Sequence, residues 1–492
     1  MARPGHRTQR RPRPRQRRPR LVEQGPLRGH ADRRRGHRSR FDRGSRFRHR
    51  RMSMLPSSPR HSASLLPAML PCAALLAMSA ICLSGCGGAP PASFRANMVE
   101  ATKQQLRPEQ EEQVATILLA MFGTPDDPVA LPETGLDEAK LRLAAGPVRS
   151  DIVGRKNGLF REHCSHCHGI TGDGLGPTAA FLNPYPRDYR PGVYKFKSTE
   201  RADKPTDADL ARILHNGIYG TSMPSFDLLG KQKIEALVEY VKYLSMRGET
   251  ELWLMRAFFD LDDEDEGRLP ETREFLVEDT LLPIAERWQE AEDAVIEVPE
   301  MPEDLDLAES IALGKELYHG NKANCVKCHG VTALGDGQAN DYDDWNKPIV
   351  QLRKELDSTL SSLAETSTAD MSPDELAEHV REIEWADRFE QVLAGDALEP
   401  RTIPPRNLRR AIYRGGRRPL DLYYRIHAGI NGAPMPAAKG TVAPEDIWHI
   451  VNYIRSLPYG FDGELGADRP LASHGGFSTG SSGVATHTRS NP

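Results

Sequence analysis

The sequence predicts an all-α protein built from two similar helical domains in tandem. The chain has 492 residues and carries the unit Cys-x-x-Cys-His twice, at residues 164–168 and 325–329. Each unit is followed by the pattern His-x-Gly-Ile-x-Gly-x-x-Met-Pro, at residues 215–224 and 427–436. Apolar residues then recur at helical spacing, in "IEALVEYVKYLS" and "IWHIVNYIRSLP". Three blocks that recur in the same order indicate a duplicated domain.

The first 53 residues form an arginine-rich leader. Residues 1–51 hold 20 arginines and three acidic residues, with too few apolar side chains to build a core. We expect residues 1–53 to be untranslated, because Met52 or Met54 opens a better export signal, or to be disordered. A basic arm for nucleic acid and a twin-arginine type signal are the alternatives.

The remainder of the chain is acidic. From Gly87 onward 44 basic residues stand against 66 acidic ones, a net charge of −22, although the whole chain carries only −4. This balance argues against nucleic-acid binding and favours a partner protein with a basic docking face.

Residues 54–86 have the composition of an export signal. Arg60 and His61 precede a run without charged residues, and small residues crowd before Cys86. The end "LSGC" resembles the lipobox of bacterial lipoproteins, which implies a lipid on Cys86 after cleavage of a lipoprotein signal peptide. The alternative is an uncleaved anchor helix. Both interpretations place the body outside the cytoplasm and tie it to a membrane, and we expect it to face the periplasm.

Residues 87–149 are predicted to be a tether followed by a helical segment. "GGAPPAS" has the composition of a flexible linker. "EEQVATILLAMFGTPDDP", residues 111–128, is an amphipathic helix ending in a turn, and we expect it to pack on the domain that follows.

The two Cys-x-x-Cys-His units predict covalent haem. Of the seven cysteines, Cys72 and Cys82 lie in the signal and Cys86 ends it, so the other four all belong to these units. In an exported protein the unit indicates c-type haem attachment, in which two thioethers hold the porphyrin and the next histidine binds iron. The sequence therefore predicts two covalently bound haem c groups. Cys164, Cys167 and His168 would hold the first, and Cys325, Cys328 and His329 the second.

Other uses of these cysteines have weaker support. A thioredoxin-like site would need a strand before the unit, and a shared zinc ion would need the two units side by side. His163 and His166 flank the first unit, and we expect them to be surface residues.

The shared methionine is the expected sixth ligand of each iron. Met223 and Met435 occupy the same position in a turn-rich block after a haem unit, where a core methionine would not need to recur. His215 and His427 open the same blocks and are the alternative ligands.

Further matches extend the repeat. "GDG" at residues 172–174 is matched to "GDG" at 335–337, and "PRDY" at 186–189 to "PRNL" at 405–408. Arg187 and Arg406 could pair with haem propionates or simply lie on the surface. We expect the helix before each unit to cross the helix after each methionine, with Phe160 and Tyr318 facing Tyr240 and Tyr453.

On these residues each half resembles a small soluble cytochrome c domain of the His/Met type. The resemblance covers about residues 150–247 and 306–459, here called the first and second repeats, and it implies an all-helical fold around a largely enclosed haem. The whole chain resembles a tandem dihaem c-type cytochrome exported as a bacterial lipoprotein. The second repeat departs from the first, because 106 residues separate His329 from Met435 whereas 55 separate His168 from Met223.

Three segments outside the matched blocks differ from the repeats in composition: an insertion, a linker and a tail. Residues 341–398 are predicted to be a helical insertion, with Ser372 capping and Pro373 opening one helix. It could dock a partner, cover a haem edge or be a passive excursion. Residues 248–305 form an acidic helical linker, and residues 460–492 have the composition of a disordered tail.

The function that follows from the resemblance is electron transfer. Iron held by histidine and methionine changes oxidation state without binding substrate. We expect a membrane-anchored carrier of single electrons between respiratory-chain partners, or the cytochrome subunit of a respiratory complex, rather than an enzyme. The alternatives are a dihaem enzyme such as a peroxidase with one displaceable distal ligand, and a redox sensor or scaffold that works through the insertion.

Overall fold

The structure is a computed structural model that describes residues 91–151, 154–261, 267–301, 305–337, 341–343 and 346–459. All of these described residues belong to one compact unit. The predicted leader, the signal peptide with Cys86 and the tail lie outside the described residues. Within the described part, no helix combines the length and apolar character needed to cross a membrane.

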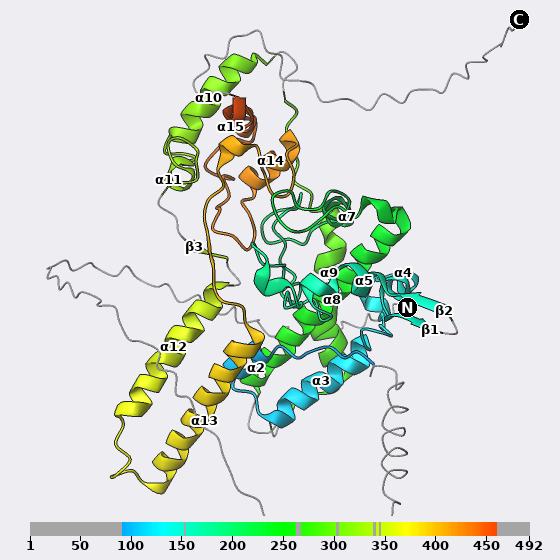
Figure 1. The fold of residues 1–492 in the computed structure, drawn as a ribbon, viewed down its shortest axis with the longest axis vertical. Coiled ribbons are helices and arrows are strands. Elements are labelled where there is room, and N and C mark those ends of the chain that lie inside the picture. The colour runs from blue at the N-terminus through cyan, green and yellow to red at the C-terminus, as the bar shows by residue number, and fades with distance from the viewer. Residues whose placement is uncertain are drawn as a thin grey trace, which may run out of the picture. The chain divides into compact units, whose positions relative to one another are not determined.

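The all-α prediction is confirmed, because helices dominate and the described strands form only two short antiparallel pairs (Figure 1). The α-helices are α2 Met98–Lys103, α3 Pro108–Phe122, α4 Glu138–Ala144, α5 Leu159–His163, α6 Ser165–His168, α7 Asp207–Asn216, α8 Lys231–Ala257, α9 Leu282–Gln289, α10 Leu307–His319, α11 Val326–His329, α12 Asn346–Glu365, α13 Pro373–Asp396, α14 Pro419–His427 and α15 Pro444–Ser456. A π-helical segment, Glu274–Leu281, leads into α9. The strands are β1 Val148–Asp151 with β2 Gly154–Asn157, and β3 Asp341–Tyr342 with β4 Thr402–Ile403.

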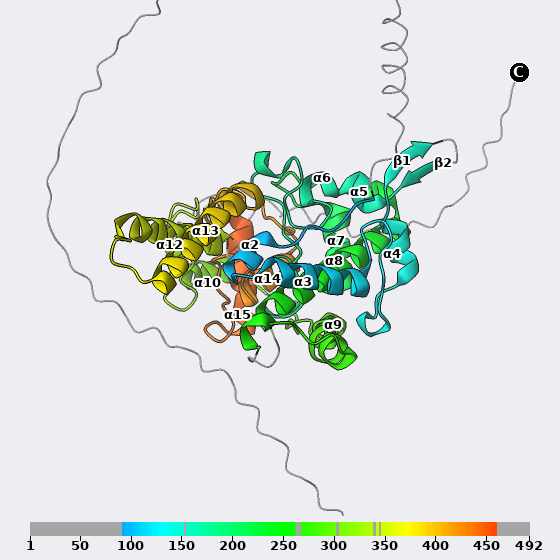
Figure 2. The same ribbon diagram turned by 90° about the horizontal axis from the view of Figure 1, so that it is seen from below.

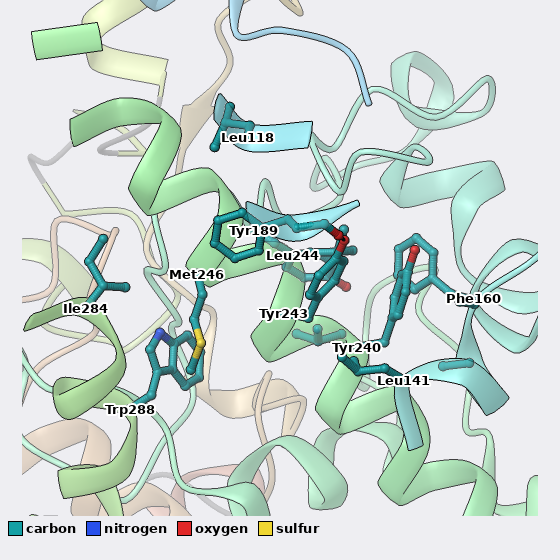
Figure 3. Close-up of a cluster of buried hydrophobic side chains, with 14 of the residues drawn as sticks. Leu118, Leu141, Phe160, Tyr189, Tyr240, Tyr243, Leu244, Met246, Ile284 and Trp288 are labelled. Atoms are coloured by element: carbon teal, nitrogen blue, oxygen red, sulfur yellow. Dashed lines mark hydrogen bonds between the residues drawn. The ribbon is translucent and has the colours of Figure 1, made fainter. Parts of the chain in front are cut away.

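The core of the first repeat is built around α8. Its buried face carries Leu237, Tyr240 and Leu244, and α3, α4, α5, α7 and α9 all pack against it. Figure 3 shows Tyr240 beside Phe160 of α5. Their ring centroids are 5.0 Å apart. The predicted pairing of these two rings is confirmed. It brings α5, and with it the first Cys-x-x-Cys-His unit, against α8.

Helix α8 continues beyond Arg247, where the sequence placed the end of the first repeat. Gly248 lies within the helix, at a point where the backbone of Arg190 passes too close for a side chain. A Cβ at Gly248 would lie 2.3 Å from the Arg190 Cα. The linker then folds back, and Trp288 of α9 donates to Glu249 at 3.0 Å.

The second repeat has its own core, centred on the crossing of α10 and α15. Gly314 permits this crossing, since a Cβ there would lie 1.9 Å from the His449 carbonyl oxygen. Tyr318 and Tyr453 meet with ring centroids 5.3 Å apart, which confirms the second predicted pair.

The insertion is a helical hairpin, α12 with α13, and the short β3–β4 pair joins its two ends (Figures 1 and 2). As predicted, Ser372 caps α13. Its Oγ accepts from the Glu375 N–H at 3.3 Å, and the Glu375 carboxylate accepts from the Ser372 N–H at 2.7 Å. The hairpin packs on α2, where Trp385 donates to the Thr102 carbonyl at 3.0 Å. Part of the insertion thus serves to hold the N-terminal helices.

Candidate haem sites

The two histidines of the Cys-x-x-Cys-His units have matching backbone partners. His168 Nδ1 lies 3.0 Å from the Arg187 carbonyl oxygen, and His329 Nδ1 lies 2.9 Å from the Arg406 carbonyl oxygen. A carbonyl only accepts, so Nδ1 carries the proton and Nε2 keeps its lone pair. This tautomer orients the imidazole as a metal ligand.

Burial keeps both imidazoles neutral. It lowers the pKa of His168 to about 4, against the opposing effect of the Arg187 carbonyl. It also lowers the pKa of His329, again against the bond to Arg406. A neutral imidazole is the form that binds iron.

The cysteines stand on one-turn helices that are alike in both repeats. The His168 N–H donates to the Cys164 carbonyl at 2.9 Å, and the His329 N–H donates to the Cys325 carbonyl at 2.9 Å. Burial raises the pKa of the Cys164 thiol to about 12 and that of the Cys325 thiol to about 11. None of the four described cysteines forms a disulfide, so all four thiols are available for thioether bonds.

The two Gly-Asp-Gly blocks do not occupy equivalent positions along the backbone, so the predicted match between them is wrong. The His168 carbonyl accepts from the Gly174 N–H and the His329 carbonyl accepts from the Gly335 N–H, each at 2.9 Å. Gly174 therefore corresponds to Gly335, and the two blocks are offset by two residues. The backbone hydrogen bonds counted from each histidine decide the register.

The same offset explains an alanine in the left-handed region. Ala333, with φ 58°, takes the position of Gly172, with φ 76°. Their carbonyls accept from Leu408 and Tyr189, at 2.9 and 2.7 Å. The match between "PRDY" and "PRNL" is thereby consistent with the structure.

A cavity of about 300 Å³ opens beside His168. Cys164, Cys167 and Met223 line it as well. Apolar walls come from α7 and α8 through Leu210, Leu214, Leu237, Val238 and Val241. Mostly apolar lining with a few convergent polar groups is typical of a cofactor pocket.

The loop that carries each methionine has the same conformation. The Met223 carbonyl accepts from the Ile218 N–H and the Met435 carbonyl accepts from the Ile430 N–H, each at 3.1 Å. Gly217, with φ 65°, lets the chain return on itself, because a Cβ there would lie 2.5 Å from the Pro224 carbonyl carbon. Gly429, with φ 71°, does the same, with its Cβ position 2.7 Å from the Met435 oxygen. Residues 217–224 and 429–436 are called the Met loops below.

The rival histidines have other partners. His215 Nδ1 lies 2.8 Å from Asp227, and His215 does not line the cavity. His427 Nε2 lies 3.3 Å from Glu200 of the first repeat. His166 is exposed, as expected, and His163 is half-buried, and both also line the cavity.

Of the Arg, Lys and Asp residues that line the cavity, only Arg187 was predicted from the sequence. Arg187 lines it, as the propionate prediction requires, and so do Lys195, Asp343 and Arg414. The last two belong to the second repeat. No local pattern marks them, because they are brought there by the packing of one repeat on the other.

These residues fit a covalently attached haem. One apolar cavity is lined by two thiols, a thioether and a neutral imidazole with a free Nε2. Cationic side chains also line it and would pair with the haem carboxylates. The second repeat presents the same donors on the same backbone pattern, with Cys325 and Met435 packed against its core.

Comparison with known proteins agrees with this geometry for the first repeat. Residues 157–245 match the family model described as Cytochrome c. No curated protein matches the chain. A solved chain of the reducing HAO-like protein complex of Kuenenia stuttgartiensis is 23% identical, with a TM-score of 0.38, over 61% of this chain and 93% of that one. Residues 157–245 are thus similar to the cytochrome c family, whose members bind haem c covalently.

Proposed function

We propose that this protein is a dihaem electron carrier that passes single electrons between redox partners. One haem c would be held by Cys164, Cys167, His168 and Met223, and a second by Cys325, Cys328, His329 and Met435. The observation that carries the proposal is the repeated backbone pattern. In both repeats an arginine carbonyl accepts a hydrogen bond from Nδ1 of the histidine. In both, an isoleucine N–H also donates to the methionine carbonyl and closes the Met loop.

The protein's own groups would set the working state of each site. When bound, the haem supplies an iron that alternates between ferrous and ferric states. The cysteines would hold it covalently, and the arginine carbonyls keep the proton on Nδ1 so that Nε2 stays available. The apolar side chains of α7 and α8 would surround the first haem.

We further propose that the protein is exported and held at a membrane, facing the periplasm, by lipid on Cys86. Its partners would be respiratory complexes or small electron carriers. The net charge of −22 from Gly87 onward supports partners with a basic docking face. Reduction by a basic redox protein should then slow as ionic strength rises, because salt screens the attraction. A rate that does not depend on salt would contradict this choice of partner.

Haem count and ligation test the carrier function directly. The mature protein should contain two haems per chain by pyridine haemochrome assay, and the Cys325→Ala/Cys328→Ala variant should contain one. Ferric spectra should show the Met-to-iron charge-transfer band, and neither haem should bind cyanide or carbon monoxide readily.

Methionine variants assign the ligands. Met223→Ala and Met435→Ala should each remove part of the charge-transfer band and open one haem to cyanide. Met371→Ala, in the turn between α12 and α13, is the matched control and should change neither. An unmodified protein in which one haem already lacks the band and binds cyanide would favour the peroxidase alternative.

A further inference from the structure

The cavity of the first repeat is not completed by the first repeat alone. Two of its lining residues, Asp343 and Arg414, come from the second repeat. Asp343 follows β3 and is 4% exposed, and it forms an ion pair with Lys195. Arg414 is only partly buried overall, but its Nε is buried and has no hydrogen-bond partner among the described residues.

The packing of the two repeats holds Arg414 in this place. Gly415 follows it with φ 81°, and a Cβ there would lie 2.3 Å from Cδ1 of Phe196, which also lines the cavity. The Arg414 carbonyl accepts from the buried Arg425 guanidinium. The backbone on both sides of the Arg414 side chain is thus fixed, by its own repeat and by an aromatic ring of the other.

The charges at the cavity do not balance. Arg187, Lys195 and Arg414 are cationic, whereas Asp343 is the one carboxylate among the lining residues. Burial, with a smaller effect from Arg406, lowers the pKa of Arg414 to about 10, and burial lowers the pKa of Arg187. A guanidinium stays protonated in proteins, so both arginines count as cations. Among the lining residues three cations stand with one carboxylate, a net charge of two that favours an anionic ligand.

We propose that Arg414 of the second repeat, with Arg187 and Lys195 of the first, forms the seat for the two propionates of the first haem. The inference rests on the proposed haem chemistry and adds that the second repeat completes the first site. Two carboxylates would offset the two excess positive charges, and a guanidinium suits a carboxylate by its paired N–H donors. The buried Nε of Arg414 would then gain a partner.

The seat also lies against the second Met loop. A Cβ at Gly432 would lie 3.3 Å from Nη1 of Arg187, and Arg201 of the first repeat donates to the Met435 carbonyl at 2.8 Å. Arg187 of the proposed seat and the second Met loop are therefore in close contact.

Redox titration of the full dihaem protein tests the seat. Ferric haem carries one more positive charge than ferrous haem, so a nearby cation favours the ferrous state. Arg414→Gln should lower the ferrous-to-ferric ratio of the first haem at fixed potential roughly tenfold, which is about 59 mV for one electron. Asp343→Asn should shift the same haem in the opposite direction. Arg414→Lys, which keeps the charge, should leave the potential near its original value.

An exposed arginine three residues away provides the matched control. Arg417→Gln removes the same charge outside the cavity and should shift the first haem much less. Equal shifts in Arg414→Gln and Arg417→Gln would overturn the proposal. If Arg414→Gln does not fold, as a thermal melt would show, the Asp343→Asn shift decides: a rise supports the seat and no rise overturns it.

The first haem is identified by the part of the charge-transfer band that Met223→Ala should remove. Haem counting on the unmodified protein comes first, and it tests the dihaem carrier separately from the propionate seat. A protein with fewer than two haems would contradict the dihaem carrier, yet the first haem's shift would still report on the seat.

Discussion

At the scale of single residues, backbone atoms do much of the work at both sites. The carbonyls of Arg187 and Arg406 choose the histidine tautomer, and Gly217 and Gly429 let the Met loops close. Both repeats carry the same residue types at these positions, and the hydrogen bonds that they share are made by backbone atoms. The Arg187 side chain also lines the first cavity.

Gly217→Ala should disturb the first Met loop. Its φ of 65° and ψ of −168° suit only glycine, and the new Cβ would meet Pro224. We expect a loss of about 1–3 kcal/mol in the free energy of unfolding from backbone strain, and a weaker charge-transfer band from a displaced Met223.

Gly230→Ala is the control for that change. Gly230 has a similar φ of 75° and ψ of 164°, but nothing lies within 4 Å of its Cβ position. It should lower stability by a similar amount in a chemical denaturation curve and leave the haem spectrum unchanged. A band that changes equally in both variants would show that general destabilisation, and not the Met loop, is responsible.

At the scale of elements, two contacts join segments that are far apart in the sequence. Helices α10 and α15 cross at Gly314, and the hairpin α12–α13 packs on α2. The first contact closes the core behind the second haem unit. The second ties the insertion to the N-terminal segment.

Gly314→Ala should separate α10 from α15. A methyl group 1.9 Å from the His449 oxygen cannot be accommodated without moving one helix, and we expect a loss of about 3 kcal/mol or more in stability, as for an overpacked core. Gly395→Ala, in α13 with open space around it, should instead stabilise by about 0.5–1 kcal/mol through helix propensity. Thermal melts of the two variants provide the comparison, and a mild effect of Gly314→Ala would contradict the close crossing.

Trp385→Ala should loosen α2 while leaving the haem sites intact. The indole donates to the Thr102 carbonyl and lies at a tilted angle to Phe389, with ring centroids 5.1 Å apart. Loss of about 1.4 kcal/mol or more of local stability should speed amide exchange in residues 98–103 at least tenfold. Leu376→Ala, 43% exposed on the same helix, should leave that exchange unchanged. Unaltered exchange in Trp385→Ala would mean that other contacts hold α2.

At the scale of the whole molecule, the first repeat forms hydrogen bonds to the Met loop of the second repeat. Arg201 donates to the carbonyls of Met435 and Ala433, at 2.8 and 3.2 Å, and Glu200 pairs with Lys439. Charge-assisted bonds to backbone oxygens are stronger than neutral ones. The position of Met435 therefore depends on a segment more than 200 residues earlier in the chain.

Arg201→Ala should weaken the second distal ligand from outside its own repeat. Each bond to a charged donor contributes about 1.5–3 kcal/mol, and we expect the second haem to bind cyanide at least tenfold more tightly while the first stays closed. Arg287→Ala removes a bond to the neighbouring Ala202 carbonyl and is the control. If the second haem stays closed in Arg201→Ala, the Met loop holds its own conformation.

The sequence by itself determined the duplicated motifs and predicted their haem chemistry. The haem units, the methionines, the all-helical character and the aromatic pairs Phe160–Tyr240 and Tyr318–Tyr453 follow from local spacing, because the helical period and the attachment motif involve only nearby residues. The predicted match between the two Gly-Asp-Gly blocks is wrong, because their register is set by backbone hydrogen bonds to His168 and His329. Residue identity alone does not show those bonds. Only the tertiary structure decided that Asp343 and Arg414 reach the first cavity and that Arg201 holds Met435. These contacts join residues separated by well over 100 positions, and their geometry depends on how two complete cores pack together.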